Sequence, residues 1–340
     1  MRQLLVLILL TISSSATDSR VALTLDTSEA DAVLSILDKR SSNSPVTNDD
    51  WQKLFASEPY ARLKQRESSM NRAFSNDDFK TFVLSDDLLR RAPALKQTLA
   101  SWKKADLNAA AEHVLAYLPS SAVIHAKVYP VIKPRTNSFV WEPKTNAAIF
   151  LYLDPDKSSA DFENTVAHEL HHIGFASITE NSAAQANLSP EAKATVEWMG
   201  GFGEGMAMLA AAGSPDVHPH ANSKPEVRAR WDHDMANFNH DLKQVEAFFF
   251  DILNGKLKTE EEQNKVGMEF FGVQGPWYTV GYKMASMVEK RFGRAALVET
   301  MSNYPKLLSL YNQAATEQNA KGGEQLATWS PELLKRVGAH

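Results

Sequence analysis

The stretch that decides the fold of this chain is Thr165-Val166-Ala167-His168-Glu169-Leu170-His171-His172-Ile173-Gly174-Phe175. It contains the pattern H-E-x-x-H. Positions i and i+4 of a helix lie on one face, so the imidazoles of His168 and His172 can bind a single metal ion. Glu169 lies about 100° further round the helix, where its carboxylate reaches a water on the metal rather than the metal itself. The pattern predicts a metal-binding helix with the geometry of a zinc hydrolase.

The residues around the motif favour a half-buried helix. Residues 158–161 supply N-cap candidates, and apolar side chains recur at helical spacing at Phe162, Val166, Leu170 and Ile173. A pair of core histidines with no metal would leave imidazole nitrogens and a carboxylate short of partners, which is costly. We therefore expect one Zn²⁺ ion here rather than a packed histidine pair.

A catalytic zinc usually takes three protein ligands and leaves one position for water. The best candidate for the third ligand is Glu204, in Gly200-Gly201-Phe202-Gly203-Glu204-Gly205-Met206-Ala207. Each glycine inside a helix costs about 1 kcal/mol relative to alanine, so this run needs a reason. Close approach of this helix to the metal helix would supply one. Glu197 is the second candidate, and a small-residue packing seam with an incidental glutamate is the alternative.

Together the two segments resemble the gluzincin metallopeptidases. His168-Glu169-x-x-His172 is followed on a second helix by Glu204-Gly205-x-Ala207, and the likeness is nearest to bacterial families described as zinc-dependent peptidases. The resemblance implies that His168, His172 and Glu204 bind zinc, that Glu169 is the general base, and that the substrate is a peptide or protein. His172 and Glu204 are further apart in sequence than in thermolysin-like or alanyl-aminopeptidase-like enzymes, which leaves the subfamily open.

The same resemblance points to Gly275-Pro276-Trp277-Tyr278-Thr279-Val280-Gly281-Tyr282. Gluzincin aminopeptidases carry Tyr-x-x-Gly on a later helix, where the tyrosine hydroxyl stabilises the oxyanion, and Tyr278 with Gly281 matches that pattern. Tyr278 is thus expected to be catalytic, with Tyr282 as the next candidate and a core aromatic cluster as the alternative. The Gly-x-Met-Glu-Asn segment by which those aminopeptidases hold a free amine is missing.

The other histidines carry weaker signals. His171 lies on a different face from the two ligands and is expected to pack or to support a ligand. His233, on a later helix, is expected to be solvated surface. The remaining histidines considered show no supporting partners in the sequence: His113, His125, His218 and His220.

Residues 1–16 have the features of a secretory signal peptide. A basic start precedes an apolar run at 4–10, and small residues at Ser14 and Ala16 suggest cleavage after Ala16. The run is far shorter than the ~20 residues needed to span a membrane. The mature protein is therefore expected to be exported, periplasmic or secreted, with no membrane span.

The amino-acid composition limits which metal ligands, catalytic groups and partners can be expected. The chain has no cysteine, which excludes disulfides, thiolate ligands and a cysteine nucleophile, so any metal must be bound by nitrogen and oxygen. An exported chain without disulfides favours a bacterial source. The formal charge is −5 with no basic stripe, so nucleic acid and anionic membranes are not expected partners.

The patterning indicates a predominantly helical α+β chain with a zincin-like core. Residues 17–118 are expected to form a helical region after a short strand at 21–25, and residues 119–340 a metallopeptidase domain. β-rich runs at 122–131, 138–141 and 147–153 predict a small antiparallel sheet just before the metal helix. The last run is either an edge strand able to add an extended peptide or an ordinary core strand. A continuous helix is expected from about 190 to 212, ending at Gly213.

Residues 17–118 could be a propeptide, a lid or an integral half of the cleft, and the lack of a dibasic or linker signal favours the last. Two other functions are compatible with the motif. One is a zinc-binding, non-catalytic interaction module, which the intact Glu169 disfavours. The other is a metal-dependent hydrolase of a non-peptide bond.

Overall fold

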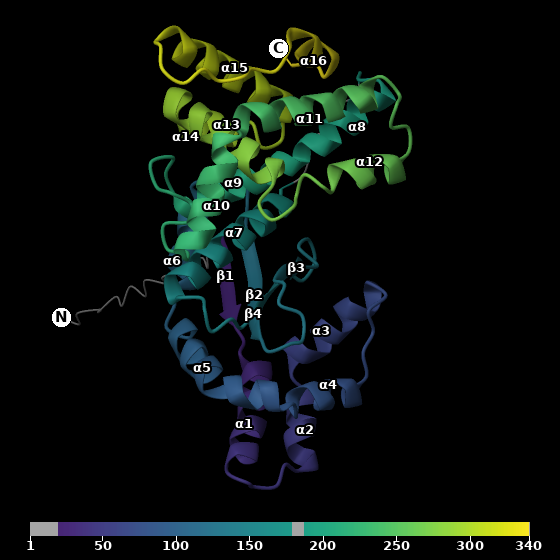
Figure 1. Cartoon of the computed structure of the whole chain (residues 1–340), viewed down its shortest axis with the longest axis vertical. Helices are drawn as coiled ribbons and strands as arrows, with labels where there is room; N and C mark the ends of the chain where they lie inside the picture. The colour runs from purple at the N-terminus through teal and green to yellow at the C-terminus, as the bar shows by residue number, and fades with distance from the viewer. Residues whose placement is uncertain (1–19, 179–186, 340) are drawn as a thin grey trace, which may run out of the picture.

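The computed structural model describes residues 20–178 and 187–339. The expected signal peptide lies outside the described residues. The predicted helical α+β class is confirmed: in the described part of the chain helices predominate, and one small sheet lies near the middle of the molecule (Figure 1). Among the described residues, no helix combines the length and the apolar character needed to cross a bilayer.

The sheet has four strands in the order β1-β2-β4-β3. Strands β1 (Val21–Leu25), β2 (Ile124–Val131) and β4 (Ala148–Tyr152) are parallel, and β3 (Phe139–Trp141) is antiparallel to β4. The expectation of an antiparallel sheet was therefore wrong for most of it. Helices α1 to α6 connect β1 to β2 and bring the chain back to the end of the sheet at which β1 begins. The two strands therefore run in the same direction, as is usual for a long crossover connection.

The possibility that residues 146–153 form an edge strand was also wrong. β4 lies between β2 and β3, so the two edges of the sheet are β1 and β3. Four of the five β4 residues are buried, as expected of a strand covered on both faces. Its apolar run thus reflects an inner position and not a site for strand addition.

Helices α1 to α5 lie at one end of the molecule and α6 beside the sheet (Figure 1). Capping boxes begin α2 at Thr47 and α4 at Ser75. Strand β1 pairs with β2 over its whole length, so this region shares the sheet that precedes the motif helix. The bounds are α1 (Ser28–Ser41), α2 (Asn48–Phe55), α3 (Glu58–Ser69), α4 (Asn76–Val83), α5 (Asp86–Trp102) and α6 (Leu107–Leu115).

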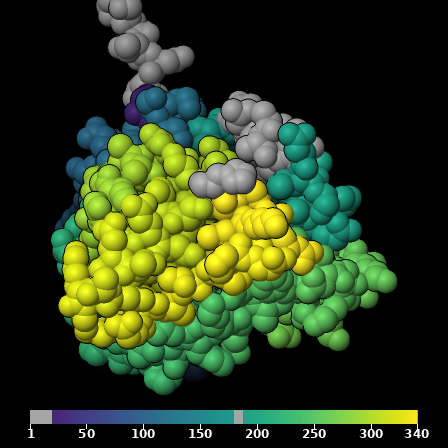
Figure 2. All heavy atoms as spheres, turned by 90° about the horizontal axis from the view of Figure 1, so that it is seen from above, coloured from purple at the N-terminus to yellow at the C-terminus, as the bar shows by residue number. Residues whose placement is uncertain are grey.

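The remaining helices form the other end, where α15 and α16 lie on the face seen from above (Figure 2). The helix expected over 190–212 is interrupted by a 3₁₀ turn (Gly200–Phe202) and ends, as expected, at Gly213, whose φ is +80°. The bounds are α7 (Ser159–Ala176), α8 (Pro190–Met199), α9 (Gly203–Ala212), α10 (Pro225–Ala236), α11 (Phe238–Leu253), α12 (Glu260–Gly267), α13 (Pro276–Phe292), α14 (Arg294–Val298), α15 (Tyr304–Ala320) and α16 (Pro331–Arg336).

One carboxyl group is buried between α1 and the end of β2. Glu29 is 0% exposed, and one of its oxygens accepts a hydrogen bond from the Ile132 amide at 3.0 Å. Its other oxygen has no hydrogen-bond partner within the described ranges. Burial raises the pKa of Glu29 from 4.5 to about 8, against the lowering effect of the Ile132 amide and Lys133. The side chain is therefore mainly protonated at neutral pH.

This pKa predicts a pH-dependent stability. Between pH 4.5 and about 8 the folded chain retains a proton on Glu29 that the unfolded chain has lost. The contribution of Glu29 to the free energy of unfolding therefore falls as pH rises through this window, by up to about 1.4 kcal/mol per pH unit. Urea unfolding of the wild type and of Glu29→Gln from pH 5 to 8.5 measures it. A stability difference between the two proteins that stays constant with pH would contradict the assignment.

Candidate metal site

Helix α7 presents the motif residues toward the interior of the molecule. The Ser158 side chain accepts a hydrogen bond from the Asp161 amide at 3.1 Å and caps the helix. The expected apolar face is buried against the core, and it comprises Phe162, Val166, Leu170 and Ile173. Burying that face leaves His168, Glu169 and His172 half-buried on the rest of the helix surface.

The two imidazoles meet one carboxylate oxygen from α9. His168 Nε2, His172 Nε2 and Glu204 Oε2 lie 3.2 Å from one another along all three edges of a triangle. Zinc bonds of 2.0–2.2 Å in tetrahedral geometry place ligand atoms ~3.3 Å apart, so the spacing suits a zinc ion. Glu197 is exposed on α8 and is not part of this group.

Hydrogen bonds alone do not account for this triangle. If each imidazole donates its Nε2 proton to Glu204, the two donor nitrogens then face each other at 3.2 Å with no acceptor between them. A cation among the three atoms removes that conflict, because neutral imidazole nitrogens and a carboxylate are all electron-pair donors. The residues therefore fit a zinc ion.

The electrostatics of the three residues keep the Glu204 carboxylate ionised and favour a proton on His172, which a bound metal ion would displace. Burial disfavours ionisation of Glu204, but the neighbouring imidazoles, led by His172, outweigh it and hold the pKa of Glu204 below its usual range. Burial disfavours the His172 cation, but the Glu204 carboxylate raises the pKa of His172. Burial, followed by the nearby His172 and His168, lowers the pKa of His171 well below its usual value. His171 is 2% exposed and packs in the core.

Glycines bring α9 and α13 into close contact. A Cβ at Gly205 would lie 2.0 Å from the Tyr282 backbone nitrogen, and a Cβ at Gly281 would lie 2.7 Å from the Phe202 carbonyl oxygen. The Trp277 ring occupies the space over Gly201. The expectation that the glycine run serves an approach to the metal helix was thus wrong: Gly201 and Gly205 face α13, and a Cβ at Gly203 would contact Tyr304 of α15.

The same contact places Tyr278 beside the triad formed by His168, His172 and Glu204. Its ring lies nearly parallel to that of His168, with centroids 6.2 Å apart and an interplanar angle of 16°. Burial, and then the nearby Glu204 carboxylate, raise the pKa of Tyr278 above its usual range. The hydroxyl therefore keeps its proton and can donate it in a hydrogen bond.

Tyr282, the second tyrosine considered, occupies a different environment. It is 8% exposed, its hydroxyl donates to the Val217 carbonyl at 3.3 Å, and its ring packs edge-on against Trp231. These contacts give Tyr282 a packing role.

Two histidines expected to lack partners have them. His218 Nε2 lies 2.9 Å from Asp232 Oδ1. His220 is 6% exposed, with Nδ1 at 3.2 Å from Ser223 Oγ and Nε2 at 2.8 Å from Gln274 Nε2. Ser223 is local to His220, but Asp232 lies on α10 and Gln274 just before α13, so the sequence alone could not have revealed these two partners.

His220 also lies near the metal site. Burial, and then His218, lower the pKa of His220 to about 4, and His168 acts in the same direction. Its neighbour Ser223 donates to Asp161 in the first turn of α7 at 2.8 Å. His220 is thus held neutral against the motif helix. By contrast, His233 is exposed on α10, as expected.

Comparison with known proteins supports a zinc site. A family model described as "Putative zinc dependent peptidase (DUF5700)" matches residues 51–320. That span contains the three ligand candidates, Glu169 and Tyr278, and the resemblance to zinc-dependent peptidases is confirmed at the level of the family. No match was found among curated proteins or among solved structures.

The α9–α13 contact generates a test of site assembly. Gly205→Ala is expected to lower the free energy of unfolding by about 1–3 kcal/mol or more, because its Cβ would meet backbone atoms that cannot move aside. Zinc retention should fall with it, since Glu204 is the adjacent residue. Thermal unfolding and metal analysis of the purified protein measure both effects.

Gly200→Ala is the matched control. A Cβ at Gly200 meets nothing within 4 Å and its φ of −53° is helical, so the change should be neutral or stabilising by up to ~1 kcal/mol. Equal effects of the two substitutions would contradict the role given to Gly205.

Proposed function

The chain belongs to the family described as "Putative zinc dependent peptidase", and from this premise we propose that it is a gluzincin-type metallopeptidase. In this proposal His168, His172 and Glu204 bind one zinc ion and the site hydrolyses peptide bonds. The observation that carries it is the 3.2 Å triangle of ligand atoms, with Glu169 next to His168 on the same helix.

Zinc, when bound, would act as a Lewis acid toward a carbonyl and lower the pKa of a coordinated water to about 7. Glu169 is the general base in this proposal. Its carboxylate is half-buried, and its charge contributes to raising the pKa values of both His172 and Tyr278, so it lies close to both. It would take a proton from the attacking water and deliver it to the leaving amine.

Tyr278 would stabilise the developing oxyanion. Its hydroxyl is protonated and near enough to Glu204 for that carboxylate to raise its pKa, so a substrate oxygen in the same region could accept its hydrogen bond. A donor aligned before the reaction begins costs no reorganisation when negative charge develops. Trp277 and Gly281 hold this part of α13 against α9, which restrains the position of the phenol.

Separate loss of the base and of a ligand distinguishes catalysis from metal binding. Glu169→Gln should retain zinc and lose peptide hydrolysis, because the amide cannot accept the proton. Glu204→Ala should lose both zinc and hydrolysis, because one of three ligands is removed. The measurements are zinc content and cleavage of a mixed peptide library.

Each alternative function has its own outcome in this experiment. Undiminished cleavage by Glu169→Gln would refute the proposed mechanism. A zinc-loaded wild type that cleaves no peptide would instead favour a binding module or a non-peptide hydrolase.

The role of Tyr278 is tested by removing one hydroxyl. Tyr278→Phe should lower kcat by about 10²–10³-fold, the usual cost of one oxyanion donor, with little change in zinc content. Tyr282→Phe is the matched control, because it loses only a bond to the Val217 carbonyl. Retention of full kcat in Tyr278→Phe would remove Tyr278 from the mechanism.

A further inference from the structure

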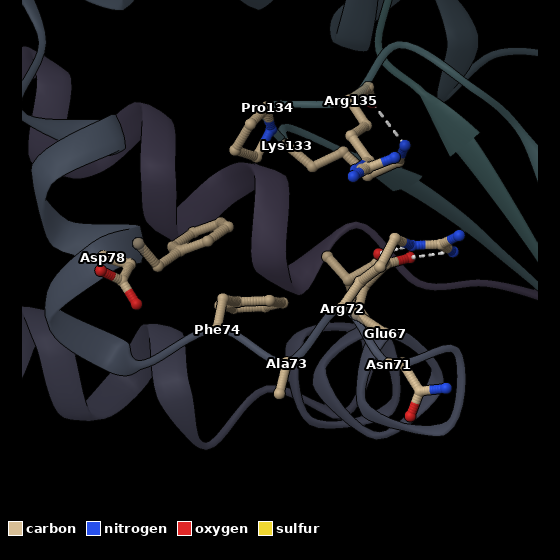
Figure 3. A pocket seen from close by; sticks show the side chains of 11 residues that line it. Glu67, Asn71, Arg72, Ala73, Phe74, Asp78, Lys133, Pro134 and Arg135 are labelled. Atoms are coloured by element: carbon tan, nitrogen blue, oxygen red, sulfur yellow. Dashed lines mark hydrogen bonds and ion pairs between the residues drawn. The ribbon is translucent and has the colours of Figure 1, made fainter.

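A cavity lies away from the metal triad, between the end of α3, α4 and the segment that follows β2 (Figure 3). Its volume is about 440 Å³, within the range of small-molecule sites. None of its lining residues comes from α7, α9 or α13. They are Leu63, Glu67, Asn71, Arg72, Ala73, Phe74, Asp78, Phe79, Lys133, Pro134 and Arg135.

One wall is built on a buried carboxylate. Glu67 is 7% exposed and receives bonds from two guanidinium groups, Arg66 at 2.6 Å and Arg72 at 2.8 Å. Burial opposes its ionisation, but the two arginines hold the pKa of Glu67 below its usual range. Two positive charges therefore share one negative charge, and Arg72 is held in place at the cavity surface.

The opposite wall is fixed by a buried lysine. Lys133 is 4% exposed, and its ammonium donates to the carbonyl oxygens of Arg135 and Asn137 and to Asn137 Oδ1. Burial lowers the pKa of Lys133 to about 8, so it is still mainly charged at pH 7. With its three protons used within the segment, Lys133 orders residues 133–137 rather than binding a ligand directly.

Arg135 is the group left available on this wall. Within residues 20–178 and 187–339 its guanidinium has neither an ion-pair nor a hydrogen-bond partner, and the residue is exposed. Figure 3 shows Lys133 and Arg135 on one side of the cavity, facing Arg72 and Glu67 on the other. The guanidinium groups of Arg72 and Arg135 can thus reach one ligand from two sides.

The rest of the cavity is aromatic. Phe74 and Phe79 stack with centroids 5.7 Å apart, and Phe74 is half-buried. The nearby Asp78 carboxylate caps α4 by accepting bonds from the Ser75 amide and hydroxyl at 2.7 Å. The site therefore has a cationic end, where positive groups outnumber carboxylates, and an apolar end.

We propose that this cavity binds a small oxyanion carried on an aromatic or apolar body. Arg72 and Arg135 bind the anionic group, and Phe74 and Phe79 contact the body. Planar guanidinium groups suit carboxylate and phosphate oxygens alike. The proposal is independent of the proposed peptidase activity, because the two sites share no residue.

Calorimetric titration of the full-length, zinc-loaded protein tests it with four probes: 3-phenylpropionate, phenyl phosphate, neutral 3-phenylpropionamide and acetate. We expect saturable binding of at least one aromatic anion and at least about 10-fold weaker binding of the amide and of acetate. The first two probes distinguish a carboxylate ligand from a phosphate ligand.

Arg135→Gln should weaken binding of the aromatic anion by at least about 10-fold without loss of thermal stability, because Arg135 has no partner to lose. Phe74→Leu should weaken it several-fold. The matched control is Arg230→Gln, on the exposed surface of α10. Failure of both anions to bind, equal binding of the amide, or undiminished affinity in Arg135→Gln would overturn the proposal; the last would indicate that a ligand sits at the zinc ion instead.

Discussion

The contact between α9 and α13 is the constraint on which the rest of the metal site depends. At Gly205 and Gly281 the two backbones approach so closely that neither position has space for a Cβ. One helix carries Glu204 and the other carries Tyr278, so a single packing contact sets the position of a candidate metal ligand and of a candidate hydrogen-bond donor. Larger residues at these positions would separate the helices and move both groups together.

The triad formed on this contact is an unfavourable arrangement without a cation. Two imidazoles and a carboxylate are partly removed from water, with three electron-pair donor atoms 3.2 Å apart. Surrounding groups partly compensate, since Glu204 stays ionised beside the imidazoles. The cost of holding the groups together is met by packing elsewhere, through the buried apolar face of α7 and the aromatic cluster around Trp277. Binding of zinc would return part of that cost as stability.

The helical region before residue 118 contributes both a strand and a helix to the part of the core that supports the motif helix. Strand β1 pairs with β2, and α6 packs on α7, so residues on both sides of position 118 belong to the sheet and core that support the metal helix. The same region forms one wall of the cationic cavity, and the segment after β2 forms the other. The candidate metal site and the cationic cavity thus both depend on the same small sheet.

The sequence alone determined the motif helix, its two histidines and Glu169, because the i, i+4 spacing and the apolar period are local properties of one helix. It also indicated Glu204 and Tyr278, through the glycine run and the Tyr-x-x-Gly pattern. Only the tertiary structure decided that the sheet is mostly parallel, that β4 is an inner strand, and that Gly201 and Gly205 face α13. The contacts of His218 with Asp232 and of His220 with Gln274, and the position of Arg72 and Arg135 on one cavity, also depend on the tertiary structure. Each depends on which distant segments meet, and long-range contacts leave no periodic trace in a single sequence.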